Sequence, residues 1–163
     1  MNFKNIDIYG IVSVSQVGQI LIPKEARENF GIQHGEHIIV GTHQATDHKE
    51  LILIKQKDHY KRTLIEPKGP GFKRFQKNFR QFGVSKAGKK GQVVIPKDAR
   101  DEYDIAPGTN FFMIGFKTPD EMYHLILIQP HIVKKFALNL LNKLMDFETS
   151  EKGEKSQNDK GEQ

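Results

Sequence analysis

The sequence predicts a mainly β fold with short helices, built from two tandem copies of one unit of about 50 residues. The first observation is a repeat, since GQILIPKEAR at Gly18 returns 73 residues later as GQVVIPKDAR at Gly91. The second is a series of short apolar runs bounded by Pro, Gly and polar residues, which is typical of strands and hairpins. The third is size, because a unit this small rarely stabilises itself alone. We therefore expect each unit to complete the core of the other.

The repeat extends beyond these ten residues at the same offset, and after one inserted residue LILIK matches LILIQ. The aligned pairs are Tyr9 with Phe82, Gly10 with Gly83, Ile32 with Ile105, Gly35 with Gly108 and Leu51 with Leu125. Five segments follow from this alignment: unit one at residues 1–55, a connecting segment at 56–82, unit two at 83–130, an amphipathic helix at 131–147 and a tail at 148–163.

Each unit predicts the order strand, turn, strand, short helix, strand, strand. In GQILIP, Ile20 and Ile22 share one face of a strand that is expected to be buried on both sides. Pro23 ends this strand and suits the first turn of the helix PKEARENF, which Gly31 closes as a left-handed cap. EHIIVG and ELILIK then indicate a hairpin. Unit two repeats the pattern with Asp104 in place of the capping glycine, a costlier residue at positive φ.

The connecting segment is the most basic part of the chain, with eight Lys and Arg against two Asp and Glu. Phe72, Phe75, Phe79 and Phe82 recur at spacings of three and four, which predicts a basic amphipathic helix. Packing against the core is favoured, while a phosphate-gripping extension and an anchor on anionic membranes stay open. As auxiliary phosphate contacts, the segment offers Lys73, Arg74, Lys77 and Arg80. A solvated linker would carry the same charge.

The C-terminal part divides into a helix and a tail. HIVKKFALNLLNKLMDF at 131–147 has an apolar stripe of about two heptads, enough for docking or for a homodimer seam. The tail at 148–163 has no residue able to build a core, and we expect it to be disordered.

Composition and motifs exclude several classes of function. The chain has 163 residues, of which 37% are hydrophobic, so a large buried catalytic cavity is not expected. Without cysteine, disulfides and thiolate chemistry are impossible. No glycine-rich phosphate loop, nucleophile elbow or paired carboxylates occur, so we expect neither an enzyme nor a cofactor. Short apolar runs predict a soluble, cytoplasmic protein that does not enter membranes.

Histidines in HGEH invite a metal interpretation, with His43 close by in the sequence. His34 and His37 lie in an expected hairpin turn, and their counterparts in unit two are Pro107 and Asn110. No metal site is therefore expected.

The motifs together resemble the AbrB/MazE/SpoVT swapped-hairpin family. They are VGQILIPKEARENFGIQHGE in unit one and KGQVVIPKDARDEYDIAPGT in unit two, and the resemblance covers roughly residues 9–55 and 82–129. It implies an AbrB-like β-barrel with interleaved hairpins, here a pseudo-dimer within one chain. It also implies a nucleoid-associated transcription regulator that binds double-stranded DNA. Pairing of each unit with its own copy in a second chain is left open.

The resemblance also implies where DNA would be contacted: the loop before the GQ strand and the start of the short helix. Unit two thus offers Lys86, Lys89, Lys90, Gln92, Lys97 and Arg100, and unit one offers Gln19, Lys24 and Arg27. Since the loop of unit one carries no charge, unit two is expected to make most phosphate contacts. The two glutamines, where many relatives have arginine, would suit adenine.

A rival interpretation is a protein-interaction module, antitoxin-like or a scaffold. The barrel would then be structural, and the Phe-rich segment, the C-terminal helix or the tail would bind a partner protein. The uncharged loop of unit one favours this alternative.

Overall fold

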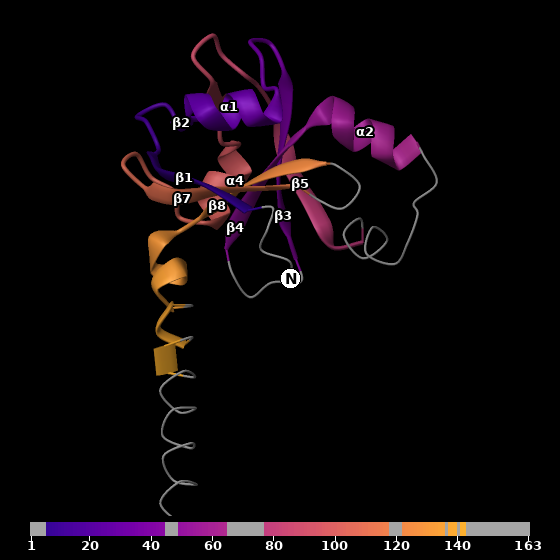
Figure 1. Ribbon diagram of the computed structural model, residues 1–163. Helices are drawn as coiled ribbons and strands as arrows, with labels where there is room; N and C mark the ends of the chain where they lie inside the picture. Colours follow the sequence, from indigo (N-terminus) through magenta and orange to yellow (C-terminus); the bar gives the residue numbers. More distant parts are fainter. Residues whose placement is uncertain are drawn as a thin grey trace, which may run out of the picture. The chain divides into compact units, whose positions relative to one another are not determined.

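Strands from the two repeat units are interleaved in one antiparallel six-stranded sheet of order β1-β7-β8-β4-β3-β5 (Figure 1). The computed structural model describes residues 6–44, 49–64, 77–117, 122–135, 137–139 and 141–142. The strands of this sheet are β1 (Ile6–Ser13), β3 (His37–His43), β4 (Glu50–Lys55), β5 (Phe79–Lys86), β7 (Asn110–Lys117) and β8 (Tyr123–Ile128). A second sheet pairs β2 (Gln19–Leu21) with β6 (Gln92–Val94). The mainly β prediction is confirmed.

Four ladders join one repeat unit to the other. Each unit keeps its own hairpin, β3–β4 or β7–β8, and sends its first strand to the hairpin of the other, so that β1 pairs with β7 and β5 with β3. The hairpins meet along β4 and β8, and β2 meets β6. Among the described residues no ladder joins β1 to β5, so the six-stranded sheet is not a closed barrel. Its edges instead contact the small sheet, β1 through β2 and β5 through β6.

Short helices follow the two strands of the small sheet, and a third follows β4. These are α1 (Lys24–Phe30), α4 (Lys97–Glu102) and α2 (Gln56–Leu64). As the sequence predicts, Pro23 precedes α1 and Gly31 closes it in the left-handed conformation, with φ of 60°. Asp104 takes the same conformation after α4, with φ of 53°, although it has a side chain. The repeat therefore imposes this turn even where the residue is less suited to it.

The core contains equivalent residues from both units. Ile22 and Ile95 are fully buried, as are Ile20 and Val93 of the two-stranded ladder. Burying one such side chain stabilises the fold by about 1.5–3 kcal/mol relative to exposing it. Because Ile20 and Val93 of the small sheet lie in the same buried cluster as residues of the large sheet, both repeats contribute to one core.

A β-bulge in each unit turns an aromatic ring toward this core. The register of β1 against β7 shifts at Tyr9, and that of β5 against β3 shifts at Phe82. The ring of Tyr9 then meets Phe30 edge-on at 6.2 Å, and Phe82 meets Tyr103 in the same way at 5.6 Å. Bulges of this kind re-aim a side chain by adding one residue to a strand.

The prediction of one helix through the four phenylalanines is wrong for its second half. Phe79 and Phe82 lie on β5, because β3 offers this segment a backbone ladder along its full length. Their spacing of three, which suggested a helix, follows from the bulge at Phe82. Phe72 and Phe75 lie outside the described residues.

Residues 130–163 form a compact region of their own, separate from the region at 1–129 that contains both repeat units. The chain is helical at 130–135, 137–139 and 141–142, within the segment predicted as an amphipathic helix. Leu138 and Leu141 are half-exposed on it, at 50% and 55%. Residues 143–147 of that helix and the tail at 148–163 lie outside the described part. None of the helices described is long and apolar enough to cross a membrane.

Candidate nucleic-acid interface

Two loops flank the two-stranded sheet at opposite ends. The lysine loop, residues 86–91, leads into β6, and the uncharged loop, residues 13–18, leads into β2. Gln19 pairs with Val94 and Leu21 with Gln92, so the strands run in opposite directions. The lysine loop therefore lies near the end of β2. There the Ile22 amide donates to the carbonyl of Gly91, the last residue of the loop, over 3.0 Å.

Each loop lies against the short helix of the other unit. A Cβ added to Gly91 would come within 2.3 Å of the Arg27 side chain of α1, and one added to Gly18 would come within 2.8 Å of Arg100 of α4. The Nε of Arg27 donates to the Ile22 carbonyl over 3.2 Å, and that of Arg100 makes the equivalent bond over 3.1 Å. Both arginines, predicted as DNA contacts, thus also hold strand, helix and opposite loop together.

The interleaving groups the predicted residues across the units. We call the lysine loop, Gln92 and α1 the basic half, and the uncharged loop, Gln19 and α4 the neutral half. Lys97 and Arg100, predicted in one set with the lysine loop, belong to the neutral half, because α4 lies against Gly18. Lys24 and Arg27 of unit one lie with the lysine loop instead.

The lysines differ in their partners. Lys86, Lys89 and Lys90 are exposed, and none forms an ion pair with the residues that the structure describes. By contrast, Lys24 lies 3.7 Å from Glu28, and Lys97 pairs with Asp101 along its helix. The lysine loop therefore presents three ammonium groups to solvent, with no counter-charge from the part of the chain that the structure describes.

The two glutamines occupy the outer face of the small sheet, opposite the buried side chains of Ile20 and Val93. The side-chain oxygen Oε1 of Gln92 accepts a hydrogen bond from the Lys90 backbone amide over 3.1 Å, so this side chain stabilises the lysine loop. The backbone amide of Gln19 donates instead to the hydroxyl of Ser15 over 3.1 Å. A bidentate adenine contact by Gln92 would share its oxygen with this turn.

Of the four auxiliary cations, the structure describes two. Arg80 forms an ion pair with Glu102 and stacks over the Phe82 ring at 4.5 Å. The hydrogen bond to Glu102 raises the pKa of this guanidinium above its ordinary value. Arg80 is thus engaged within the fold, whereas Lys77 is exposed. Lys73 and Arg74 lie outside the described residues.

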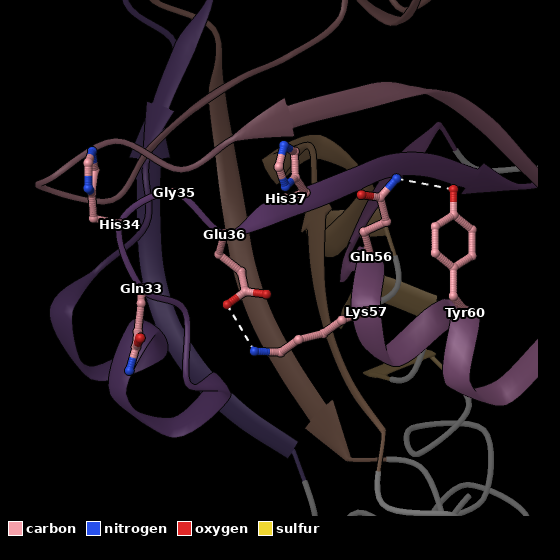
Figure 2. A pocket seen from close by; sticks show the side chains of 8 residues that line it. All are labelled: Gln33, His34, Gly35, Glu36, His37, Gln56, Lys57 and Tyr60. Carbon is pink, nitrogen blue, oxygen red and sulfur yellow. Dashed lines mark hydrogen bonds and ion pairs between the residues drawn. The ribbon is translucent and has the colours of Figure 1, made fainter.

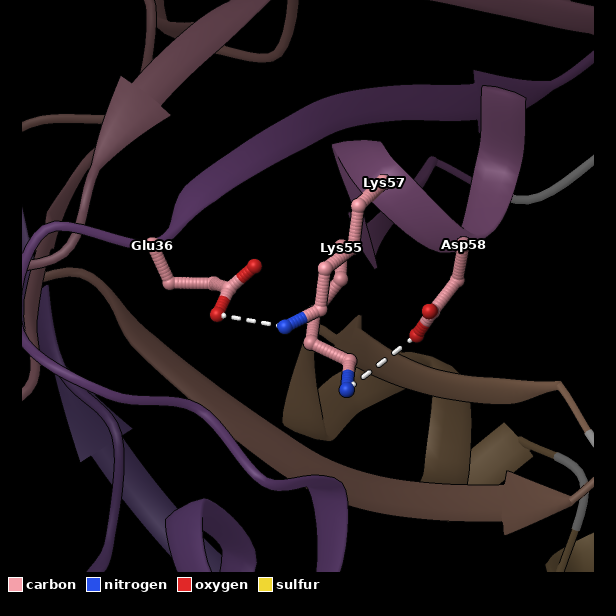
Figure 3. A network of polar contacts seen from close by, with 4 residues as sticks. All are labelled: Glu36, Lys55, Lys57 and Asp58. Carbon is pink, nitrogen blue, oxygen red and sulfur yellow. Dashed lines mark hydrogen bonds and ion pairs between the residues drawn. The ribbon is translucent and has the colours of Figure 1, made fainter. Parts of the chain in front are cut away.

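A pocket of about 400 Å³ lies beside the lysine loop, between the turn at residues 33–37 and the first turns of α2 (Figure 2). It is lined by Gln33, His34, Gly35, Glu36, His37, Gln56, Lys57 and Tyr60. Lys57 contacts Glu36 at 3.1 Å, and the Gln56 amide donates to the Tyr60 hydroxyl over 3.1 Å. Figure 3 shows a second ion pair of α2, in which Lys55 lies 3.1 Å from Asp58.

This turn is bonded directly to the lysine loop. The Gly35 amide donates to the Ala87 carbonyl, and the Ala87 amide donates to the Glu36 carbonyl, both over 2.8 Å. His37 lies opposite Lys86 in the β3–β5 ladder. Sequence reasoning missed this support, because α2 lies outside the repeated motif and Glu36, at the end of the motif, has the uncharged Thr109 as its counterpart in unit two. Within the described residues, no group of three or more His, Asp and Glu side chains is placed to hold a metal ion.

Neither a protein-family model nor a curated protein matches the sequence. Among solved structures, the chain is similar to one described as the solution structure of PHS018 from Pyrococcus horikoshii. The two are 22% identical, with a TM-score of 0.35, over 76% of this chain and 92% of that one.

Proposed function

We propose that this chain is a DNA-binding transcriptional regulator of the AbrB-like type, acting at the nucleoid. Its two repeats would form a pseudo-dimeric swapped-hairpin unit within one chain. The motif resemblance supports the family, and the four ladders between the units support the interleaving. The observation that carries the proposal is the lysine loop, with three exposed ammonium groups that have no counter-charge among the described residues.

The loop is well suited to phosphates because its backbone is held in place. The Gly91 amide donates to the Gly88 carbonyl over 3.0 Å, and the Gly88 amide donates to that of Gln92 over 2.9 Å. A held loop loses little conformational entropy when its lysines meet a duplex. Each neutralised phosphate contributes about −0.9 to the slope of log K against log salt concentration.

The test uses the uncharged loop of unit one as the template for a variant. The substitutions Lys86→Ser, Lys89→Gln and Lys90→Val write the residues at positions 13, 16 and 17 into unit two. Binding to random-sequence duplex DNA is measured by fluorescence anisotropy over a salt series. We expect the slope to fall by about 2.7 and the affinity near 0.1 M salt to fall about 10-fold or more.

A charge-matched control removes three lysines elsewhere, through Lys49→Gln, Lys61→Gln and Lys117→Gln. None of these lies in either loop. This control is expected to keep the wild-type slope to within about one contact. Wild-type protein that fails to bind DNA at low salt, or loop and control variants that lose the same slope, would overturn the proposal.

A second candidate is a protein-interaction module, which the half-exposed Leu138 and Leu141 favour. A partner protein, or a second copy of the chain, would cover these side chains through the segment 131–147. In the full chain, Leu138→Glu with Leu141→Glu would then abolish a co-purifying partner or the dimer in sedimentation. Unchanged DNA binding in the same variant would separate this role from the regulator.

A further inference from the structure

The two halves of the candidate interface share one backbone. The Ile95 amide donates to Gly18 over 2.9 Å, as the Ile22 amide does to Gly91 over 3.0 Å. The turns beside the loops repeat too, since Gly108 donates to Val14 over 2.7 Å as Gly35 does to Ala87 over 2.8 Å. A symmetric duplex would therefore meet the same shape on both halves.

Their charges are different. The basic half carries five cations, Lys24, Arg27, Lys86, Lys89 and Lys90, against two carboxylates, Glu25 and Glu28. The neutral half carries two cations, Lys97 and Arg100, against three carboxylates, Asp98, Asp101 and Glu102, of which Glu102 is paired with Arg80. A half without a net positive charge replaces few of the counterions of a duplex.

The surface next to each half continues this difference. Beyond the lysine loop, the hydrogen-bonded turn carries the exposed His34 and His37, while the Lys57 ammonium that reaches it from α2 is paired with Glu36. The imidazole N–H groups can donate hydrogen bonds to phosphate oxygens. At the positions equivalent to the two histidines, the turn beside the neutral half has Pro107, which has no donor, and Asn110.

We infer that one chain grips duplex DNA through the basic half alone, displaced from the pseudo-twofold axis of the β2–β6 sheet toward the turn at residues 33–37. The DNA partner is accordingly a single half-site without twofold symmetry. This inference rests on the proposed function and specifies how the same surface is used.

The absence of cysteine allows a direct test of the displacement. Gln33→Cys and Ala106→Cys place one thiol at equivalent, exposed positions of the two turns. Each variant is labelled with an iron chelate that cleaves nearby DNA by hydroxyl radicals, and random-sequence duplex is added. We expect cleavage from residue 33 to exceed that from residue 106 at least about 5-fold, because only the basic half is attracted to the duplex.

A second measurement compares the equivalent lysines of the two helices. Lys24→Gln is expected to lower the salt slope by about 0.9, while Lys97→Gln leaves it unchanged. Adding lysines to the other loop through Ser13→Lys, Gln16→Lys and Val17→Lys is expected to raise the slope by up to about 2.7 and to make cleavage from residue 106 appear.

The outcomes distinguish the two proposals. Wild-type protein that does not bind DNA defeats the proposed function itself. Binding with equal cleavage from both thiols, or with equal slope losses for Lys24→Gln and Lys97→Gln, leaves the regulator intact and overturns the one-sided grip.

Discussion

Arg27 lies directly over Gly91, so the helix of one repeat covers the glycine that ends the lysine loop of the other. Gly91 has φ of +87°, and a Cβ there would meet the Arg27 Cδ at 2.3 Å. Gly91→Ala should therefore cost both backbone strain and a displaced arginine, about 2–4 kcal/mol of the free energy of unfolding in urea titrations.

Gly108→Ala provides the matched control for that substitution. Its φ of +85° is nearly the same, but a Cβ there would meet no atom within 4 Å. It should cost only about 1–2 kcal/mol for the left-handed conformation. Equal losses for the two variants would show that the arginine gives way without cost.

Substituting each bridging arginine by methionine separates structure from binding. Arg27→Met and Arg100→Met each remove one hydrogen bond to a carbonyl within the same repeat unit. Both should lower the free energy of unfolding by about 0.5–1.5 kcal/mol. If DNA binds through the basic half alone, only Arg27→Met should also lower the slope of log K for DNA against log salt concentration. Unequal stability losses would contradict the equivalent roles of the two side chains.

The buried isoleucines after the small sheet should be equally important. Ile22 and Ile95 are both fully buried and belong to one cluster. Truncation of either to alanine should cost about 2–5 kcal/mol, since each leaves a cavity in the same core. Thermal unfolding followed by circular dichroism should show a single transition for each variant, shifted downward. Two separated transitions would mean that the repeats fold independently.

Alkaline pH should weaken the fold through Tyr9. Burial, the largest cause, raises the pKa of its phenol above the ordinary value, while a hydrogen bond from Asn29 acts in the opposite direction. Above about pH 10 the unfolded chain loses this proton first, so the native state holds more protons and stability falls as pH rises. The contribution is fully present below pH 10 and is lost as pH rises through the folded-state pKa.

Tyr9→Phe should flatten this decline, because the phenylalanine ring has no proton to lose. The comparison is the difference in free energy of unfolding between wild type and variant at pH 8 and about pH 11. The same difference at both pH values would exclude Tyr9 as the source.

The repeat motif predicted the short helices, the hairpins and a mainly β fold, because each depends on local pattern. Which loop meets which helix could not be predicted from it. Both copies carry the same glycine and arginine, and only the bond from Ile22 to Gly91 in the folded chain assigns Arg27 to the lysine loop. The sequence showed that one loop is basic and the other uncharged. That the lysine loop lies beside Lys24 of α1 became clear only from the interleaved strands of the structure.

Phe79 and Phe82 show where periodicity misleads. A spacing of three suggests a helix, yet a strand with one extra residue produces the same spacing. The bulge at Tyr9 was not predicted from the sequence either. The alignment of Tyr9 with Phe82, both aromatic residues before a glycine, marked the two equivalent positions. The contact between Glu36 and Lys57 could not be foreseen, because the two residues are 21 positions apart and Lys57 lies outside the repeat.

Because β1 reaches β7 and β5 reaches β3 within one chain, the interleaved core forms without an encounter between molecules. A homodimer of single units unravels on dilution, since its folded state is coupled to protomer concentration. Here the two partners are held at a fixed effective concentration by the chain that joins them. Dilution should leave the unfolding midpoint of the interleaved core unchanged, so that the chain would stay folded even at very low protein concentration.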